Sequence, residues 1–134
     1  MSDDQTSALV RSMPFAEVLG IEEVTAEPNR VTGSMAWEPG RCTGGGVLHG
    51  GALMGLADSL GALCALLNLP DGATSTATIE SKTNFLRPVR GGRVRAVARP
   101  LHVGRTVIVV DTELRDDGDQ LVARVTQTQA VLRG

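Results

Sequence analysis

Aromatic residues are scarce in this sequence. Only Phe15, Trp37 and Phe85 occur among 134 residues, and tyrosine is absent. Proteins that bind single-stranded nucleic acids stack bases on aromatic rings, so the composition argues against a nucleic-acid partner. Hydrophobic residues still make up 42% of the chain, which is typical of a globular domain. The core must therefore be built from Val, Leu, Ala, Ile and Met.

Cysteine and histidine are equally sparse. Cys42 and Cys64 are too few for a disulfide framework, and neither has metal-ligand spacing to His49 or His102. The sequence therefore predicts no structural disulfide, no metal and no redox cofactor.

We expect neither a leader peptide nor a membrane span in this sequence. Its acidic start is not followed by an apolar run, so we expect a cytoplasmic protein. The segment 47–67 is long and apolar, but it contains His49, Asp58 and Ser59, and a carboxylate at the bilayer centre is costly. A buried core helix is the better interpretation, and no membrane partner is expected.

Acidic residues are missing between Glu80 and Asp111, although the formal net charge is only −2. This interval holds the basic residues Lys82, Arg87, Arg90, Arg93, Arg95, Arg99 and Arg105. The alternating arginines fit the solvated face of a strand. They equally fit a site for a ligand that carries phosphates, because guanidinium groups pair with phosphate oxygens. Both interpretations stay open.

The length suits one domain, residues 1–134, with the first twelve expected to be flexible. Pro14 and Gly20 bound a short helix, and an apolar stretch from Gly50 to Leu67 predicts the one long helix. Turn residues separate strands predicted at 21–27, 30–37, 74–86, 93–102, 106–114 and 121–132. Hairpin strands around one helix predict an α+β domain with an antiparallel sheet.

The long helix carries a leucine stripe at steps of three and four residues, namely Leu53, Leu56, Leu60, Leu63 and Leu67. This stripe should pack on the sheet. One helix cannot cover a long curved sheet, so we also expect dimerisation through an edge strand.

Asp58 interrupts this apolar helix. A carboxylate in a buried helix is rare unless it is paired or functional. Its neighbours one turn away include Gly55 and Gly61, and each glycine costs a helix about 1 kcal/mol relative to alanine. The glycines leave room beside Asp58 for another molecule, which favours a functional carboxylate. Alternatively, Asp58 is a hydrogen-bonded core residue and the glycines permit close helix packing.

His49, Gly50 and Gly51 stand where the helix begins. Helix N-termini present free N–H groups, and glycine allows close approach of a ligand, so this end could stabilise an oxyanion. The alternative is an ordinary glycine-rich loop. Gly50 and Asp58 are eight residues apart, about 12 Å along a helix axis. A site that uses both must therefore be shared between two subunits.

The segment from His49 to Asp58 resembles the His-Gly-Gly…Ala-Asp/Glu motif of the PaaI-type hotdog acyl-CoA thioesterases. Residues 84–88 and 92–105 are also similar to the branch that includes the dihydroxynaphthoyl-CoA thioesterases of menaquinone synthesis. The similarity extends from about Phe15 to Leu132. It implies the hotdog fold, a curved antiparallel sheet wrapped around one central helix, and a homodimer that pairs into a dimer of dimers.

The resemblance also implies roles for individual residues. Asp58 matches the nucleophile or general base, the Gly50 N–H matches the oxyanion donor, and Thr78 matches a residue that holds the attacking water. His49 lies at the edge of this site. The expected contacts to the acyl-CoA substrate are Thr43, Gly51, Phe85, Arg87, Arg90, His102, Val103, Gly104, Arg105 and Thr106.

Thr43 departs from the family pattern, because relatives commonly have Asn or Gln six residues before the motif histidine. Asp58 likewise replaces the glutamate that is usual in the menaquinone branch. We therefore keep two functions open: hydrolysis of an acyl- or aroyl-CoA to the free acid and CoA, and a non-catalytic acyl-CoA-binding hotdog protein. A dehydratase is disfavoured, since neither histidine has the required spacing to Asp58.

Overall fold

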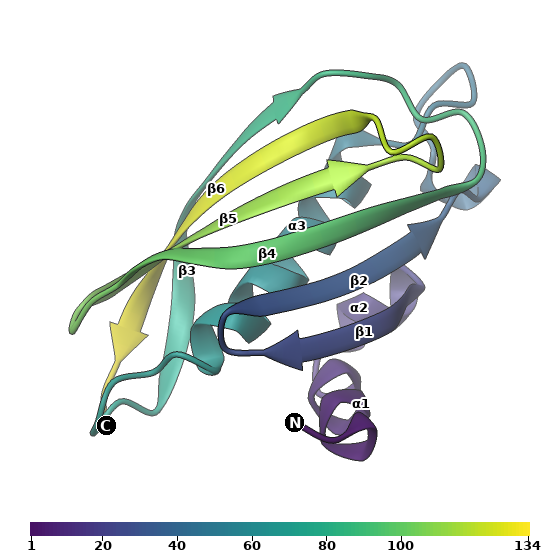
Figure 1. The fold of residues 1–134 in the computed structure, drawn as a ribbon. Coiled ribbons are helices and arrows are strands. Elements are labelled where there is room, and N and C mark those ends of the chain that lie inside the picture. Colours follow the sequence, from purple (N-terminus) through teal and green to yellow (C-terminus); the bar gives the residue numbers. More distant parts are fainter.

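The computed structural model describes the whole chain, residues 1–134 (Figure 1). The helices are α1 (Asp3–Arg11), α2 (Pro14–Val18) and α3 (Gly50–Leu66), with a short 3-10 turn at Pro39–Arg41. The strands are β1 (Ile21–Glu27), β2 (Arg30–Ala36), β3 (Ser75–Phe85), β4 (Arg93–Val103), β5 (Val107–Arg115) and β6 (Leu121–Leu132). Every strand predicted from the sequence is confirmed, with small shifts at the ends.

The six strands form one sheet in the order β1-β2-β4-β5-β6-β3, and all neighbours are antiparallel. Strand β5 shows why the sheet has two unlike faces. Ile108, Val110, Thr112 and Leu114 are buried, whereas the residues between them are partly exposed. This period-two pattern buries one face against a helix and leaves the other in water.

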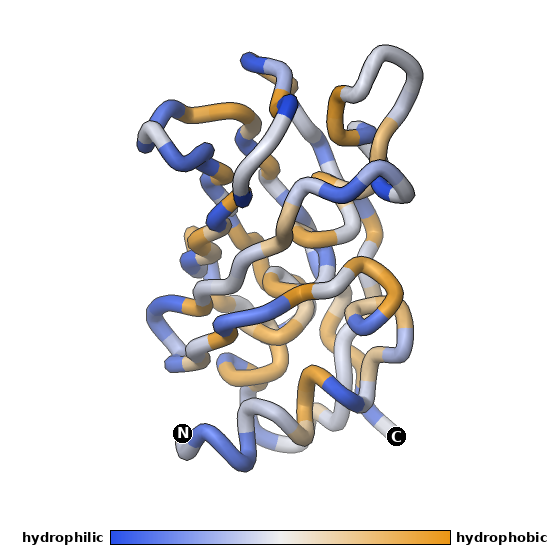
Figure 2. The backbone as a smooth tube through the Cα atoms, turned by 90° about the vertical axis from the view of Figure 1, so that its right-hand side faces the viewer, coloured by the Kyte–Doolittle hydropathy of each residue, from blue (hydrophilic) through white to orange (hydrophobic).

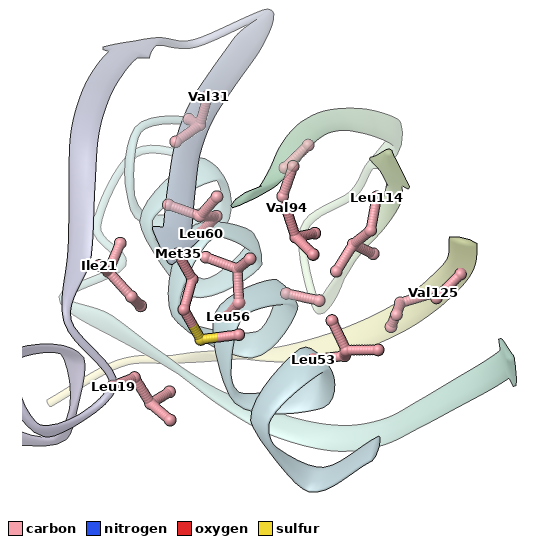
Figure 3. Packing of buried hydrophobic residues seen from close by; sticks show 14 of the residues in the cluster. Leu19, Ile21, Val31, Met35, Leu53, Leu56, Leu60, Val94, Leu114 and Val125 are labelled. Atoms are coloured by element: carbon pink, nitrogen blue, oxygen red, sulfur yellow. The ribbon is translucent and has the colours of Figure 1, made fainter. Parts of the chain in front are cut away.

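Helix α3 fills the concave side of the sheet, as the hotdog fold requires (Figure 1). Leu53, Leu56, Leu60 and Leu63 are buried, and Leu67 is partly buried at the helix end. Figure 3 shows Leu53, Leu56 and Leu60 directed toward Met35, Val94 and Leu114 on the strands. Hydrophobic segments gather toward the middle of the molecule, and hydrophilic ones lie mainly at its periphery (Figure 2). The predicted leucine stripe is therefore the centre of the core.

The sequence predicts no helix in the first twelve residues, which we expect to be flexible. In the structure nine of them form α1, whose N-terminus has a capping box in which Ser2 and Gln5 exchange hydrogen bonds. Thr6 is buried, and Leu9 and Val10 pack against the core. The capping pair satisfies helix N–H groups that would otherwise need water, so a short helix is stable there. None of the helices has the length and hydropathy that a membrane crossing requires.

The two sheet edges differ in how they are protected. Edge strand β1 has seven residues and an irregular register between Glu22 and Thr25, with Glu23 at a φ of 55°. Edge strand β3 is longer, at eleven residues, and most of its residues are exposed. Its Ile79 side chain is 62% exposed. A long, open edge with an exposed apolar residue favours pairing with another strand.

Leu60 tests the helix–sheet contact. It is fully buried, so Leu60→Ala should lower the free energy of unfolding by about 2–5 kcal/mol through lost burial and the cavity left behind. Leu66→Ala is the matched control, because Leu66 lies on the same helix and is 36% exposed. Urea denaturation followed by circular dichroism measures both. Equal losses for the two variants would contradict the packing described here.

Candidate functional site

Asp58 lies at the boundary between α3 and β3. It lines a hollow of about 220 Å³ together with Met54, Gly55, Thr78 and Ser81. The expectation that Asp58 would be buried is wrong for the single chain, where its residue is exposed. The sheet ends at β3, so this side of the helix has no strand over it. The carboxylate is therefore accessible to a ligand or to a second subunit.

One oxygen of the Asp58 carboxylate is held by two hydrogen bonds. The Thr78 hydroxyl donates to Oδ1 at 2.8 Å, and the Gln127 amide Nε2 donates to the same atom. Thr78 in turn accepts a hydrogen bond from Gln129 Nε2 at 2.8 Å. The other carboxylate oxygen, Oδ2, has no hydrogen-bond partner within the chain. The carboxylate thus has one fixed and one free oxygen.

The two glycines near Asp58 pack closely against side chains of their own chain. A methyl group at Gly61 would lie 1.7 Å from Gln127 Oε1. A methyl group at Gly55 would lie 2.7 Å from Leu19 and 3.3 Å from Phe15. At Gly61 the space expected for a ligand is therefore filled by Gln127, whereas Gly55 lines the hollow beside Asp58. The close-packing alternative raised from the sequence accounts for Gly61.

The start of α3 has the features of an oxyanion site. His49 is the N-cap, and its Nδ1 accepts a hydrogen bond of 2.7 Å from the Gly51 N–H. The Gly50 N–H has no acceptor within the chain. The Phe85 ring lies close to Gly50, because a methyl group built there would be 2.9 Å from the ring. A groove of about 380 Å³ runs past Gly50, lined by residues 47–48 and 85–89 and by Leu53.

Gly50 and Asp58 are separated along one continuous helix. Eight residues at 1.5 Å each correspond to about 12 Å, far more than the roughly 3 Å that links an oxyanion to its donor. Thr43 lies on the exposed loop before the helix, where its backbone N–H donates to the Val47 carbonyl at 2.8 Å. We call Asp58 and the Gly50 N–H the two candidate half-sites, and a single chain keeps them apart.

Two arginines of the basic interval form ion pairs on the sheet. Arg93 on the outer face of the sheet pairs with Glu22 and Glu23, and Arg95 pairs with Asp117. The Ser34 hydroxyl donates to Glu23, and together with these arginines it lowers the pKa of the Glu23 carboxyl. For these two arginines the structure supports the interpretation as a solvated sheet face.

Three further arginines of this interval lie beyond the two ends of β4, with Arg87 and Arg90 before it and Arg105 after it. Arg87 and Arg90 are exposed before the strand, and Arg90 donates to the Gly45 carbonyl at 3.3 Å. Arg105 belongs to the turn 102–106 at the end of the strand. The Val131 N–H donates a hydrogen bond to the Thr106 carbonyl in this turn. Eleven residues of strand span roughly 33 Å, so a single chain does not bring these arginines to one phosphate group.

Gln127 and Gln129 were not predicted from the sequence. They occupy consecutive inward positions of β6, and both are fully buried. In the sequence alone, glutamines at alternate positions of a strand suggest a polar face that is exposed to water. Only the register of β6 against β3, which places Gln129 opposite Thr78, shows that these amides point toward Asp58.

Comparison with known proteins decides the family. Residues 45–123 match the family model described as the thioesterase superfamily. A Pseudomonas aeruginosa protein named as an esterase is 38% identical over 122 residues, which are 90% of this chain and 84% of that protein. The chain belongs to the thioesterase superfamily. Its catalysed reaction class is therefore thioester hydrolysis.

Other thioesterases are similar in sequence or structure. The 1,4-dihydroxy-2-naphthoyl-CoA hydrolase of Escherichia coli is 37% identical over 87 residues, or 65% of this chain and 63% of that enzyme. A thioesterase of Haemophilus influenzae superposes with a TM-score of 0.89 at 28% identity, covering 99% of this chain and 92% of that one. A mutant thioesterase of Pseudomonas aeruginosa superposes with a TM-score of 0.88 at 33% identity, covering 98% of this chain and 94% of that one. The hotdog fold predicted from the sequence is thereby confirmed.

The two thiols of this thioesterase should differ in reactivity. Burial raises the pKa of the Cys64 thiol to about 11, whereas Cys42 is partly exposed beside His49. Because the thiolate is the reactive form, only about one Cys64 in a thousand is ionised near pH 8. Iodoacetamide should label one cysteine quickly in the folded protein and both in urea, as counted by mass spectrometry. Rapid labelling of folded Cys42→Ser protein would contradict the burial of Cys64.

Proposed function

We propose that this thioesterase hydrolyses acyl-CoA thioesters with Asp58 as its catalytic carboxylate. The observation that carries the proposal is the asymmetry of this group: Oδ1 is hydrogen-bonded to Thr78 and Gln127, Oδ2 has no hydrogen-bond partner within the chain, and Asp58 lines an open hollow. A carboxylate fixed in this way can present one oxygen to a substrate in a single orientation. The Escherichia coli relative, whose name specifies a naphthoyl-CoA substrate, supports aroyl-CoA as one candidate class.

Two routes lead from this geometry to the products. In the first, Oδ2 takes a proton from a water molecule whose oxygen attacks the thioester carbonyl, and the tetrahedral intermediate expels the CoA thiolate. In the second, Oδ2 attacks the carbonyl itself, the thiolate leaves, and water hydrolyses the resulting mixed anhydride. Both routes give a free acid and CoA. Neither uses a metal or another cofactor, since CoA is part of the substrate.

The oxyanion would be held by the Gly50 N–H of a partner subunit. The β3 edge is open, so two copies of the chain can pair their β3 strands antiparallel about a two-fold axis. Within each chain Gly50 lies next to Phe85, and Asp58 next to Thr78. Pairing that sets Thr78 near Phe85 of the partner subunit would therefore bring the two half-sites together.

The CoA portion would extend from this shared site toward the basic ends of the strands. Residues proposed to contact it are His49, Thr43, Gly51, Phe85, Arg87, Arg90 and the turn 102–106. The same two-fold relation carries the turn of one chain toward Arg87 and Arg90 of the other, so that both groups can approach one ligand. Pairing of two such dimers into a tetramer is proposed from family resemblance alone.

A second function, acyl-CoA binding without turnover, is favoured by one observation. Thr43 is exposed on a glycine-rich loop, and its short hydroxyl replaces the longer amide side chain common in relatives. Loss of a donor to the thioester would weaken catalysis more than binding.

Asp58→Ala tests the catalytic assignment. Thiol release from short, medium, long and aromatic acyl-CoAs should fall at least about a hundredfold, because the base or nucleophile is lost. Asp71→Ala is the control, since Asp71 is exposed in a turn outside the site. Hydrolysis by the Asp58 variant at the wild-type rate would refute its role. Tight CoA-ester binding by wild-type protein with no turnover would favour the binding function.

Ile79→Lys tests the shared site. A charge on the exposed edge of β3 should prevent strand pairing, so the variant should sediment as a monomer and lose nearly all turnover. Leu101→Lys adds the same charge at a residue that is 61% exposed on β4, and it should stay active. Analytical ultracentrifugation and thiol release measure both properties. A monomer with wild-type turnover would show that one chain is sufficient.

A further inference from the structure

Strand β6 buries two glutamines behind the proposed catalytic carboxylate. Gln127 and Gln129 are both 0% exposed, and their Nε2 atoms donate toward Asp58, directly and through Thr78. The carbonyl oxygen of each amide is buried and has no hydrogen-bond partner. The Gln127 amide thus donates to the carboxylate and the Gln129 amide to the Thr78 hydroxyl, while the carbonyl oxygens of both amides remain unsatisfied.

Such an arrangement is unfavourable for folding alone. A buried carbonyl oxygen without a partner loses its hydration without compensation. The neighbouring inward positions of the same strand, Val125 and Val131, are occupied by valine, which has no polar atom to satisfy. Asp58 does not need the amides for its own solvation either, because it is exposed on the open side of α3. Neither core packing nor the burial of Asp58 therefore explains the glutamines.

Gly61 forms the third part of this arrangement. It lies one turn after Asp58, and its backbone packs against Gln127 Oε1, where an added methyl group would come within 1.7 Å. A side chain of any size at position 61 would therefore displace the Gln127 amide from the carboxylate. Glycine has low helix propensity, and it occupies the position of α3 against which the Gln127 side-chain amide packs.

We propose that Gln127 and Gln129 are positioning residues for thioester hydrolysis, and that Gly61 is the space that Gln127 requires. The inference rests on the proposed catalytic role of Asp58. Two donors converge on Oδ1, so rotation of the carboxylate would break both hydrogen bonds at once. Oδ2 is thereby kept directed into the hollow, where the thioester or the attacking water must lie. Gln129 acts one step further away by orienting the Thr78 hydroxyl.

The test compares steady-state kinetics of Gln127→Met, Gln129→Met and Gly61→Ala with the wild type. Methionine keeps the length of glutamine and removes both polar atoms. For Gln127→Met and Gly61→Ala, kcat should fall about tenfold or more, as expected for a lost charge-assisted hydrogen bond, with KM changed less than twofold. Gln129→Met should have a smaller effect. Thr128→Val, on the opposite face of β6, is the control and should keep wild-type kinetics.

The double variant Gly61→Ala/Gln127→Met gives a second, independent criterion. If Gly61 acts only through Gln127, the double variant should be no slower than Gln127→Met alone. Thermal unfolding checks folding, and removal of the unsatisfied oxygen should leave the melting temperature of Gln127→Met equal or higher. A purely structural role would lower stability and leave kcat unchanged.

Asp58→Ala, measured in parallel, separates the two proposals. An inactive Asp58 variant beside fully active Gln127→Met and Gly61→Ala proteins would overturn the positioning role and leave the thioesterase proposal intact. An active Asp58 variant would overturn both. If Gln127→Met does not fold, Gly61→Ala still decides, since wild-type kcat in that variant contradicts the inference.

Discussion

The fold depends on one contact, the burial of the leucine face of α3 in the concave side of a single sheet. That contact buries only part of the surface of α3. The sheet ends at β3, so the side of α3 that carries Met54, Gly55 and Asp58 has no strand of its own chain above it. An apolar helix in water would be unstable without such burial, yet a helix enclosed completely would have no place for a substrate. This side of α3 is open because the sheet has no further strand beyond β3.

The polar residues of the site lie at the boundary between this core and the open side of α3. Thr78 is on the last strand, and Gln127 and Gln129 are on the strand beside it, so their side chains reach Asp58 from the core. Hydrogen bonds from a packed sheet are more restrictive than bonds from a loop, because the donors cannot move without disturbing the core. The same core that stabilises the domain therefore restricts the orientation of the carboxylate.

Much of the fold could be predicted because it depends on local patterns. The leucine stripe, the turn residues and the alternation in the strands gave nearly all element boundaries. The N-terminal helix was missed, although Ser2 and Gln5 form a recognisable capping box. The burial of Gln127 could not be found in this way, because it depends on which strand lies beside Asp58. Likewise, an isolated sequence cannot tell whether Gly61 makes room for a ligand or for a side chain of its own chain.

Two separations within the chain have the same geometric origin. Gly50 is about 12 Å from Asp58 along α3, and Arg105 lies at the opposite end of β4 from Arg87. Helix α3 begins beside the end of β3 and the turn 102–106 lies near its beginning, as the contacts of Phe85, Thr74 and Val131 show. A two-fold axis beside β3 would place the end of β3 of one chain next to the beginning of β3 of the other. Gly50 of one chain would then lie near Asp58 of the other, and Arg105 near Arg87. Pairing through β1, on the far edge of the sheet, would leave both apart. One symmetry operation at the unprotected edge would thus be enough to complete the proposed catalytic site and its proposed phosphate contacts.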